Sequence, residues 1–238
     1  MKLAVFDVDG TLTNTSEVDS VCFKLALAEA HAITEVKTWN AFHHVTDSGI
    51  TLQIFQEQIG RTPSDNDLAK LKGCFVNLLS EHHERDAGYF AEITGAAMLL
   101  NRLQQEADWA IAIATGCWQE SARLKLKAAG IHLNGIPAAF AEDSIAREEI
   151  VQTAVARAAT HYRQASFEKV VSIGDGLWDV RTAANLGLAF IGVASGERAE
   201  MLRTAGAKHV IEDLRDADTF LRLLHEVEAP EIRKAAAI

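Results

Sequence analysis

The sequence predicts an α/β fold with a parallel sheet and an all-helical segment inserted after the first strand. From about residue 90 onward, short apolar runs alternate with stretches of helical spacing. This alternation is typical of a parallel sheet covered by helices on both faces. One further apolar run, Leu3 to Phe6, stands alone at the N-terminus, and residues 15 to 85 contain helical patterns but no convincing strand.

The opening strand ends in two carboxylates. Leu3 to Phe6 is a short continuous apolar run that stops before Gly10, which suits a strand buried on both faces. Asp7 and Asp9 follow it, and side chains two apart on a strand point to the same face. Like charges this close repel one another unless a cation or a proton lies between them. We therefore expect a divalent metal or a shared proton here.

The inserted segment carries three predicted helices, over residues 17–30, 50–59 and 65–83. Between the first two lies a polar run that ends at Gly49 and can face the active site. We expect at least one of its side chains to contact substrate; the candidates are His43, His44, Thr46, Asp47 and Ser48. A metal role for the histidine pair is disfavoured, because neighbours on an extended segment point in opposite directions.

The remaining elements complete a doubly wound, Rossmann-like sheet. Strands are expected over 109–114, 138–140, 169–174, 189–193 and 209–211, and helices over 94–106, 119–129, 145–160, 175–186, 197–204 and 217–227. Residues 1–14 and 86–238 then form the α/β core domain, and residues 15–85 form a helical cap domain. An insert at this point lies above the carboxyl ends of the strands, where open α/β sheets bind ligands.

Three predicted strands end in polar groups. The first ends in the two aspartates, the second in Thr115-Gly116, and the third in Gly174-Asp175 with Asp179 one helical turn later. If these strands are neighbours, their carboxylates converge into an oxygen-rich site suited to Mg²⁺. A hydroxyl and free backbone N–H groups, as at Thr115-Gly116, suit a phosphate oxygen.

Composition narrows the possible partners. The chain has 238 residues and a formal net charge of -10, which argues against nucleic acid or an anionic membrane as the partner. No apolar run approaches the roughly 20 residues needed to cross a bilayer. Three cysteines give no disulfide framework and no metal-binding spacing. We expect a cytoplasmic protein whose chain is frayed beyond Pro230. The sequence indicates no particular oligomeric state.

The order and spacing of these motifs resemble the haloacid dehalogenase (HAD) superfamily, which contains many phosphatases. Asp7-Val-Asp-Gly-Thr11 is similar to the family's DxDGT motif, and Ile113-Ala-Thr115-Gly116 to its hydrophobic-strand Ser/Thr motif. The segment from Gly174 to Asp179 is similar to its acidic GDxxxD motif. The insert resembles the family's mobile cap, and the phosphoglycolate-phosphatase-like branch is the most similar.

The resemblance implies roles for these residues. Asp7 would attack phosphorus and become an aspartyl phosphate, and Asp9 would act as the general acid and base. Thr115, with Gly10 and Gly116, would hold the phosphoryl group. The Mg²⁺ ligands would be Asp7, the main-chain carbonyl of Asp9, and Asp175, with Asp179 in support. An acid at position 9 also favours phosphoryl transfer over dehalogenation, since halide needs no proton to leave.

One motif of the family departs from its usual form. The basic residue that holds the nucleophile and the phosphate is commonly a lysine, and here Arg147 stands at the corresponding place, with Lys169 as the other candidate. Arginine binds phosphate well through its planar fork. The expected function is a Mg²⁺-dependent phosphatase acting on a small phosphorylated metabolite. A phosphomutase with the same core chemistry and a non-catalytic binding or regulatory module of this fold are the alternatives.

Overall fold

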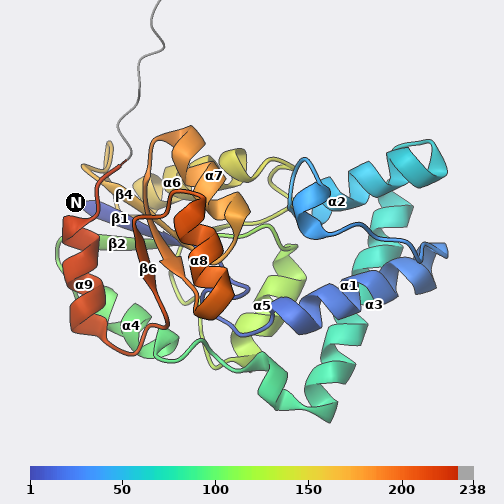
Figure 1. The fold of residues 1–238 in the computed structure, drawn as a ribbon, viewed down its shortest axis with the longest axis horizontal. Coiled ribbons are helices and arrows are strands. Elements are labelled where there is room, and N and C mark those ends of the chain that lie inside the picture. The colour runs from blue at the N-terminus through green and yellow to red at the C-terminus, as the bar shows by residue number, and fades with distance from the viewer. Residues whose placement is uncertain (230–238) are drawn as a thin grey trace, which may run out of the picture.

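The computed structural model describes residues 1–229, and the expected fraying beyond Pro230 lies outside the described residues. One lobe is an α/β core around a six-stranded parallel sheet, and the other is a group of helices beside it (Figure 1). The sheet order is β3-β2-β1-β4-β5-β6. Its strands are β1 (Lys2–Phe6), β2 (Trp109–Ala114), β3 (Ala138–Ala139), β4 (Val170–Gly174), β5 (Ala189–Val193) and β6 (His209–Ile211).

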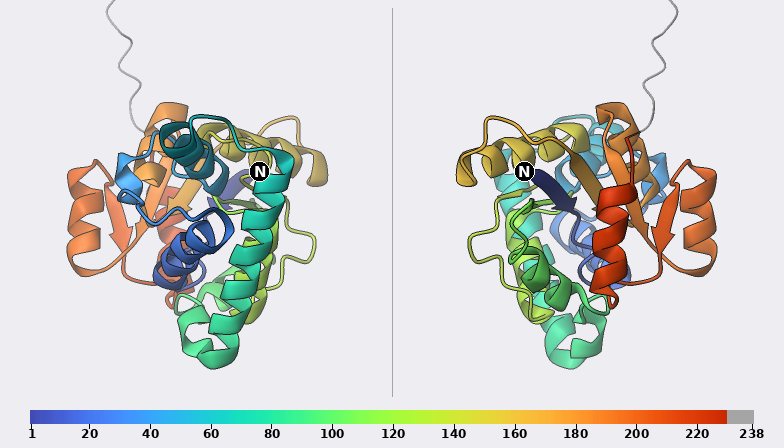
Figure 2. Two further views of the ribbon diagram at one scale, coloured as in Figure 1. Left: turned by 90° about the vertical axis from the view of Figure 1, so that its right-hand side faces the viewer. Right: turned by 90° about the vertical axis from the view of Figure 1, so that its left-hand side faces the viewer.

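Helices cover both faces of the sheet, as the end-on views show (Figure 2). Alternate residues of β1 divide between the faces, because successive side chains on a strand point to opposite sides. Ala4 and Phe6 pack with α4 (Ala96–Leu103) and α9 (Ala217–Glu226). Leu3 and Val5 pack with α6 (Arg147–His161). The predicted α/β fold class with a doubly wound sheet is therefore confirmed.

The remaining core helices flank the strands that follow the cap. Helix α5 (Gln119–Ala128) follows β2, α7 (Leu177–Leu186) follows β4, and α8 (Gly196–Thr204) follows β5. Helices α7 and α8 pack together over Phe190 of β5. The alternation of strand and helix brings the carboxyl ends of all six strands to one edge of the sheet, and this edge faces the cap.

The second lobe holds its own apolar core. It consists of α1 (Ser16–His31), α2 (Asp47–Ile54), which continues as the π-helical turn η2 (Phe55–Ile59), and α3 (Asp65–Arg85). Short 3₁₀ turns flank them at η1 (Trp39–Ala41) and η3 (Ala87–Phe90). Helices α1 and α3 pack side by side around Phe23 and Phe75, whose rings meet edge to face at 5.4 Å.

Element bounds differ from the sequence prediction mainly at helix starts. Helix α2 begins at Asp47, three residues before the expected start, because the Thr46 hydroxyl accepts a hydrogen bond from Gly49 N and caps the helix. Helix α4 is shorter than the expected 94–106 and begins after Gly95, which has a φ of 88°.

The predicted boundary between the core domain and the cap domain stays a prediction. No helix among residues 1–229 is long and apolar enough to cross a membrane.

Trp118, which stands just before α5, joins the two lobes through apolar packing. Its indole is 1% exposed and lies within the apolar core of the cap, with ring centroids 5.7 Å from Phe23 and 6.2 Å from Phe75. A core residue thus fills space between two cap helices. The backbone around Trp118 is tied to the cap as well, because its N–H donates to Asp47 Oδ2 at 2.8 Å.

Lys125 of α5 joins the lobes through charge. Its side chain is fully buried, and Nζ lies 2.5 Å from Asp9 Oδ2 of the core and 2.5 Å from Asp19 Oδ1 of α1. Burial alone would lower the pKa of Lys125, but the two carboxylates outweigh burial and raise it well above its usual value. The ammonium therefore stays charged and neutralises acids from both lobes.

We expect Trp118→Ala to lower the free energy of unfolding by roughly 3 to 5 kcal/mol, the range for deleting a large buried aromatic side chain. The loss is expected because the substitution would leave a cavity between the two lobes. Urea denaturation of wild type and variant measures it. Met98→Ala, at an exposed position on α4, is the control and should shift the value by no more than about 0.5 kcal/mol. Equal effects of the two substitutions would contradict this packing role.

Lys125→Met should lower the free energy of unfolding by about 3 to 5 kcal/mol, because it leaves buried carboxylates without their cation. Adding Asp19→Asn to it should restore part of the loss, since one of the two carboxylates is then gone. Lys127→Met, at an exposed position of the same helix, controls for helix effects. A loss below about 1 kcal/mol in Lys125→Met would show that the pair contributes little.

Candidate active site

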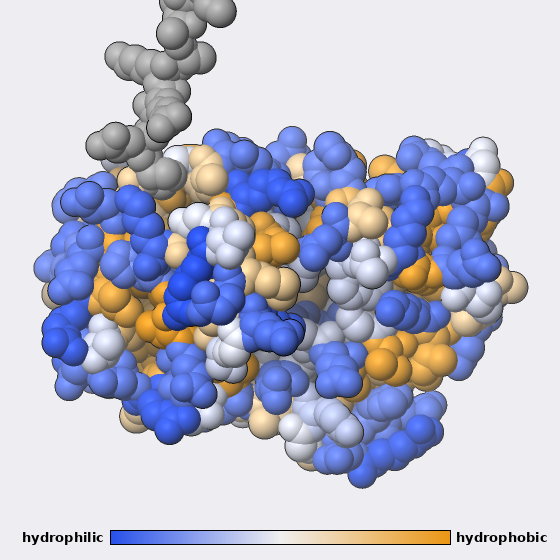
Figure 3. Space-filling model, viewed as in Figure 1, coloured by the Kyte–Doolittle hydropathy of each residue, from blue (hydrophilic) through white to orange (hydrophobic). Residues whose placement is uncertain are grey.

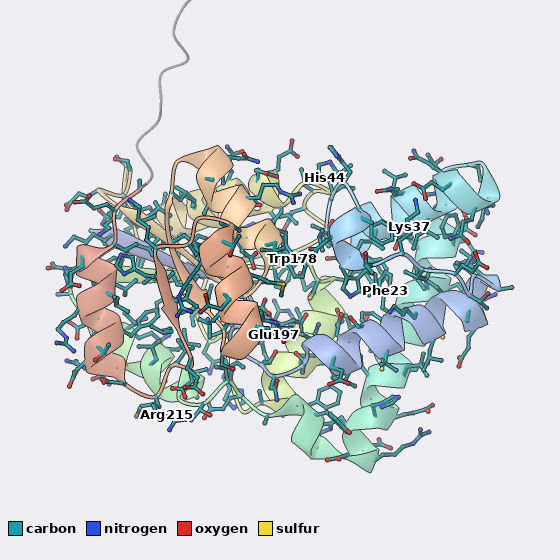
Figure 4. The ribbon with its side chains drawn as sticks, in the orientation of Figure 1. Phe23, Lys37, His44, Trp178, Glu197 and Arg215 are labelled. Atoms are coloured by element: carbon teal, nitrogen blue, oxygen red, sulfur yellow. The ribbon has the colours of Figure 1, made fainter. Side chains whose placement is uncertain are left out.

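A cavity of about 450 Å³ lies between the carboxyl edge of the sheet and the cap. The space-filling view shows a hollow between the two lobes (Figure 3). Phe23 of the cap and Trp178 of the core lie on opposite sides of this region (Figure 4). Strands β1, β2 and β4 are neighbours in the sheet. The polar groups that follow them, Asp7, Thr115 and Asp175, therefore meet in one cavity.

Asp7 follows directly on β1 and is held by neighbours on both carboxylate oxygens. Oδ1 accepts a hydrogen bond from Val8 N at 2.8 Å, and Oδ2 lies 3.1 Å from Arg147 Nη1. The side chain is 7% exposed and lines the cavity. A carboxylate fixed in this way at a cavity wall is accessible to a ligand and can serve as a nucleophile.

Asp7, Asp175 and Asp179 form a buried acidic group, in which one oxygen of each lies within 4.8 Å of the others. Burial raises the pKa of Asp175 well above its usual value, and the charges of Asp179 and Asp7 raise it further. Burial also raises the pKa of Asp179 to about 7, against the opposing effect of Arg147. Such crowding of acids is stabilised by a positive charge among them.

Arg147 supplies one positive charge to this group. Its Nη1 lies 3.1 Å from Asp7 Oδ2 and 2.9 Å from Asp179 Oδ1, and Nη2 donates to the Val45 carbonyl at 3.0 Å. A Cβ atom at Gly116 would lie 2.5 Å from Nη2, so that a larger residue would displace the guanidinium. The other candidate, Lys169, points away from the cavity and donates to the His225 carbonyl at 2.9 Å.

The carboxylate of Asp9 belongs to a second, separate group. It accepts hydrogen bonds from the hydroxyl of Thr15 and, at 2.7 Å, from the thiol of Cys117, beside the ion pair with Lys125. Burial would raise the pKa of Asp9, but Lys125 and these hydrogen bonds outweigh it and lower the pKa. The expectation that these two carboxylates share one cation or proton was therefore wrong. Strand β1 ends at Phe6 and the chain bends at Val8, so the side chains of Asp7 and Asp9 enter separate groups.

Two small residues fix the remaining geometry. Gly10 has a φ of 74°, and a Cβ atom there would lie 2.0 Å from Asp175 Oδ2, so only glycine lets the β1 turn and this carboxylate approach each other. Thr115 is 1% exposed and lines the cavity, where its hydroxyl accepts a hydrogen bond from Cys117 N at 3.3 Å. Phosphate binding by Thr115, Gly10 and Gly116 stays a prediction.

The polar cap segment contributes less to the cavity than expected. Thr46 and Asp47 line it, but His43 and Ser48 are not among the lining residues. The Thr46 hydroxyl donates to the Ile145 carbonyl at 2.8 Å, and the Ser48 hydroxyl donates to the Ala141 carbonyl at 2.7 Å. These hydroxyls attach the cap to the core. His43 and His44 were expected to point in opposite directions, but the chain bends at residues 42–44 and their rings pack against each other at 4.4 Å. His44 lies at the outer edge of the molecule (Figure 4).

The sequence candidates did not include four polar residues that group with the aspartates of the site: Asp19, Cys117, Lys125 and Arg198. Lys125 shares the buried face of α5 with Ala122 and Leu126, so a lysine at apolar spacing was the available signal. The spacing of the cysteines assigned no role to Cys117, yet its thiol contacts Asp9. Arg198 Nη1 donates to Asp175 Oδ2 at 3.0 Å, and nothing in the spacing around it indicated this contact.

The acidic group suits a hard divalent cation. Its three members offer carboxylate oxygens, the ligands that Mg²⁺ and similar ions prefer. The raised pKa of Asp175 points the same way, because burial and two acidic neighbours disfavour its ionised form unless positive charge is nearby. The second group, of Asp9, Asp19 and Cys117, already encloses the ammonium of Lys125.

Comparison with known proteins relates this site to a family. A family model described as haloacid dehalogenase-like hydrolase matches residues 4–193. A solved hydrolase from Pseudomonas syringae is 24% identical, with a TM-score of 0.71 over 93% of this chain and 98% of the other. No curated protein sequence matches this chain.

Two further solved structures share the fold. A candidate β-phosphoglucomutase from Bacteroides vulgatus is 15% identical, with a TM-score of 0.67 over 95% of this chain and 89% of the other. CbbY from Rhodobacter sphaeroides, solved with phosphate, is 20% identical, with a TM-score of 0.65 over 90% of this chain and 95% of the other. The family model covers most of the chain, from β1 to the end of β5. The chain therefore belongs to the haloacid dehalogenase-like hydrolases.

Proposed function

We propose that this hydrolase is a Mg²⁺-dependent phosphatase that cleaves a small phosphorylated metabolite through an aspartyl phosphate on Asp7. The observation that carries the proposal is the pairing of each aspartate with its own cation. Asp7 contacts Arg147 in the acidic group, and Asp9 contacts Lys125 in the second group. Two carboxylates at one cavity, in separate environments, can take separate roles as nucleophile and as proton carrier.

The reaction has two steps. First, an oxygen of Asp7 attacks phosphorus, the bond from phosphorus to the ester oxygen breaks, and Asp9, which must enter this step protonated despite its ion pair with Lys125, gives its proton to that leaving oxygen. Second, water attacks the phosphorus of the aspartyl phosphate and loses a proton to Asp9. The bond between phosphorus and Asp7 then breaks, which releases phosphate, regenerates the carboxylate of Asp7 and leaves Asp9 protonated for the next cycle.

Charge compensation makes the attack possible. Arg147 lies against Asp7, so a phosphate dianion can approach the nucleophile with less repulsion. Asp7, Asp175 and Asp179, with the main-chain carbonyl of Asp9, would hold Mg²⁺, and the ion would add positive charge at the transferring phosphoryl group. Thr115 and Gly116 would bind the phosphoryl oxygens at the end of β2.

The phosphomutase alternative shares all of this core chemistry. The likeness to a candidate β-phosphoglucomutase concerns the fold and does not favour one reaction over the other. The two differ in the acceptor of the phosphoryl group, which is water in a phosphatase and a phosphorylated intermediate in a mutase. Steady release of inorganic phosphate from an ester therefore separates them, and a non-catalytic module would release none.

Asp7→Asn tests the mechanism. Turnover of an aryl phosphate with Mg²⁺ should fall by at least about a thousandfold, because the amide is a poor nucleophile. The melting temperature should change little, and the wild type should lose activity in EDTA and regain it with Mg²⁺. Asp65→Asn, at an exposed cap position, should keep full activity. Wild-type-like turnover by Asp7→Asn, or an activity indifferent to EDTA, would refute the proposal.

Arg147→Ala and Lys169→Ala test which basic residue serves the phosphate. Arg147→Ala should lower kcat/KM for an aryl phosphate by roughly a hundredfold or more, since it removes a charge that contacts the nucleophile. Lys169→Ala should stay within about threefold of wild type, because this lysine bonds to α9 instead. The opposite order of effects would assign the role to Lys169.

A further inference from the structure

The wall that the cap contributes to the cavity is acidic and aromatic. Its charged members are Glu17, Asp19 and Asp47, and its aromatic members are Phe23 and Trp39. Within residues 1–229, the cap places no lysine, arginine or histidine in this wall. The cap side faces the part of a substrate that leaves after phosphoryl transfer, so its chemistry selects the leaving group.

The cations of the core are already matched by core acids. Arg147 lies between Asp7 and Asp179, and Arg198 contacts Asp175. Two arginines and the carboxylates that would hold Mg²⁺ thus serve the phosphate end. A second carboxylate or phosphate on the leaving group would meet the cap wall without any cation to pair with, and an unpaired buried charge is costly.

Glu17 is the acid of the cap wall whose charge is not balanced by an ion pair. It is exposed and forms no salt bridge within the described part of the chain. Asp19 shares its ammonium with Asp9. Burial, reinforced by the charge of Asp19, raises the pKa of Asp47 well above its usual value, so Asp47 serves as a hydrogen-bonding group. Burial likewise raises the pKa of Asp19, to about 6, and its carboxylate contacts Lys125, so the negative charge of the wall comes mainly from Glu17.

The aromatic members add a second attraction for positive charge. Phe23 and Trp39 meet edge to face at 5.9 Å, and Trp39 Nε1 donates to Ser20 Oγ at 2.6 Å, which fixes the indole. Trp178 lines the cavity from the core. The face of an aromatic ring attracts an ammonium group. Trp39 already does so, because the exposed Lys24 Nζ lies 5.3 Å from its ring centroid.

We propose that the substrate is a phosphate monoester of an amino alcohol, with the phosphate at Asp7 and an ammonium group at the wall of Glu17, Phe23 and Trp39. The inference rests on the phosphatase function proposed above. Acid and aromatic rings together distinguish an ammonium from a neutral group of the same shape. A cavity of about 450 Å³ accommodates a short-chain ester of this kind.

Matched substrates test the proposal with the full-length protein and Mg²⁺. Choline phosphate and ethanolamine phosphate are compared with dimethylbutyl phosphate, the neutral carbon isostere of choline phosphate, and with phosphoglycolate, which carries a second anion. We expect kcat/KM for the better ammonium ester to exceed that for the neutral isostere by at least about tenfold, and that for phosphoglycolate by more.

The variant Glu17→Gln tests whether this preference arises at the cap wall. The ratio of kcat/KM for the ammonium ester to kcat/KM for the neutral isostere should fall by at least about threefold in this variant, since one attraction is removed. Glu35→Gln is the matched control, because Glu35 is an exposed cap acid outside the cavity. It should keep both the wild-type ratio and the wild-type activity.

The outcomes separate the two proposals. Turnover of an aryl phosphate without preference for ammonium esters overturns the substrate inference and leaves the phosphatase function intact. Preference for phosphoglycolate, or an unchanged ratio in Glu17→Gln, overturns it as well. If wild type releases phosphate from none of these esters, the aryl phosphate included, then both proposals fail.

Discussion

The constraint on which this structure depends is the compensation of negative charge where β1 ends. Asp7 and Asp9 leave the strand within one turn, and each enters a buried group of acids around one cation. Arg147 comes from α6 and Lys125 from α5, so both helices must be in place before both aspartates have their cations. Fold and site are therefore specified together, since the contacts that position the carboxylates also tie α5 and α6 to the segment that follows β1.

The sequence was informative wherever one local pattern decided the outcome. The apolar runs of β1, β2 and β4 predict buried parallel strands, and adjacency of those strands brings Asp7, Thr115 and Asp175 to one cavity. The side chains that pair with these groups could not be predicted in the same way. Lys125 reaches Asp9 across 116 residues of chain and Arg147 reaches Asp7 across 140. Such pairings depend on helix rotation and lobe placement, which periodicity does not encode, and Arg147 was expected only through resemblance.

The cap segment from Val45 to Ser48 illustrates why polar loops are difficult to interpret from sequence. Its composition suggested substrate contact, yet most of its hydrogen-bonding capacity goes to the core. Asp47 N donates to the Gly116 carbonyl at 2.7 Å, and the Val45 carbonyl accepts from Arg147. The groups that hold the cap are thus neighbours of those that would hold phosphate. Any movement of the cap at this segment must alter the surroundings of Arg147 and Gly116, so closure of the cap would be coupled to the phosphate binding proposed above.

The two ends of the cavity differ in how their acidic side chains are balanced by cations. At the core end, acids and cations are paired almost one to one, which leaves a divalent ion and a phosphate dianion as the natural additions. At the cap end, the lysine that could have balanced Asp19 is shared with Asp9, and Glu17 has no cation partner within residues 1–229. An unpaired carboxylate beside fixed aromatic rings is stabilised by water in the free protein. Once a ligand excludes that water, the carboxylate attracts a positively charged group more strongly. Because Lys125 is shared between Asp9 and Asp19, the cap wall keeps a net negative character. The contact that positions the proposed proton carrier would therefore also bias the choice of leaving group.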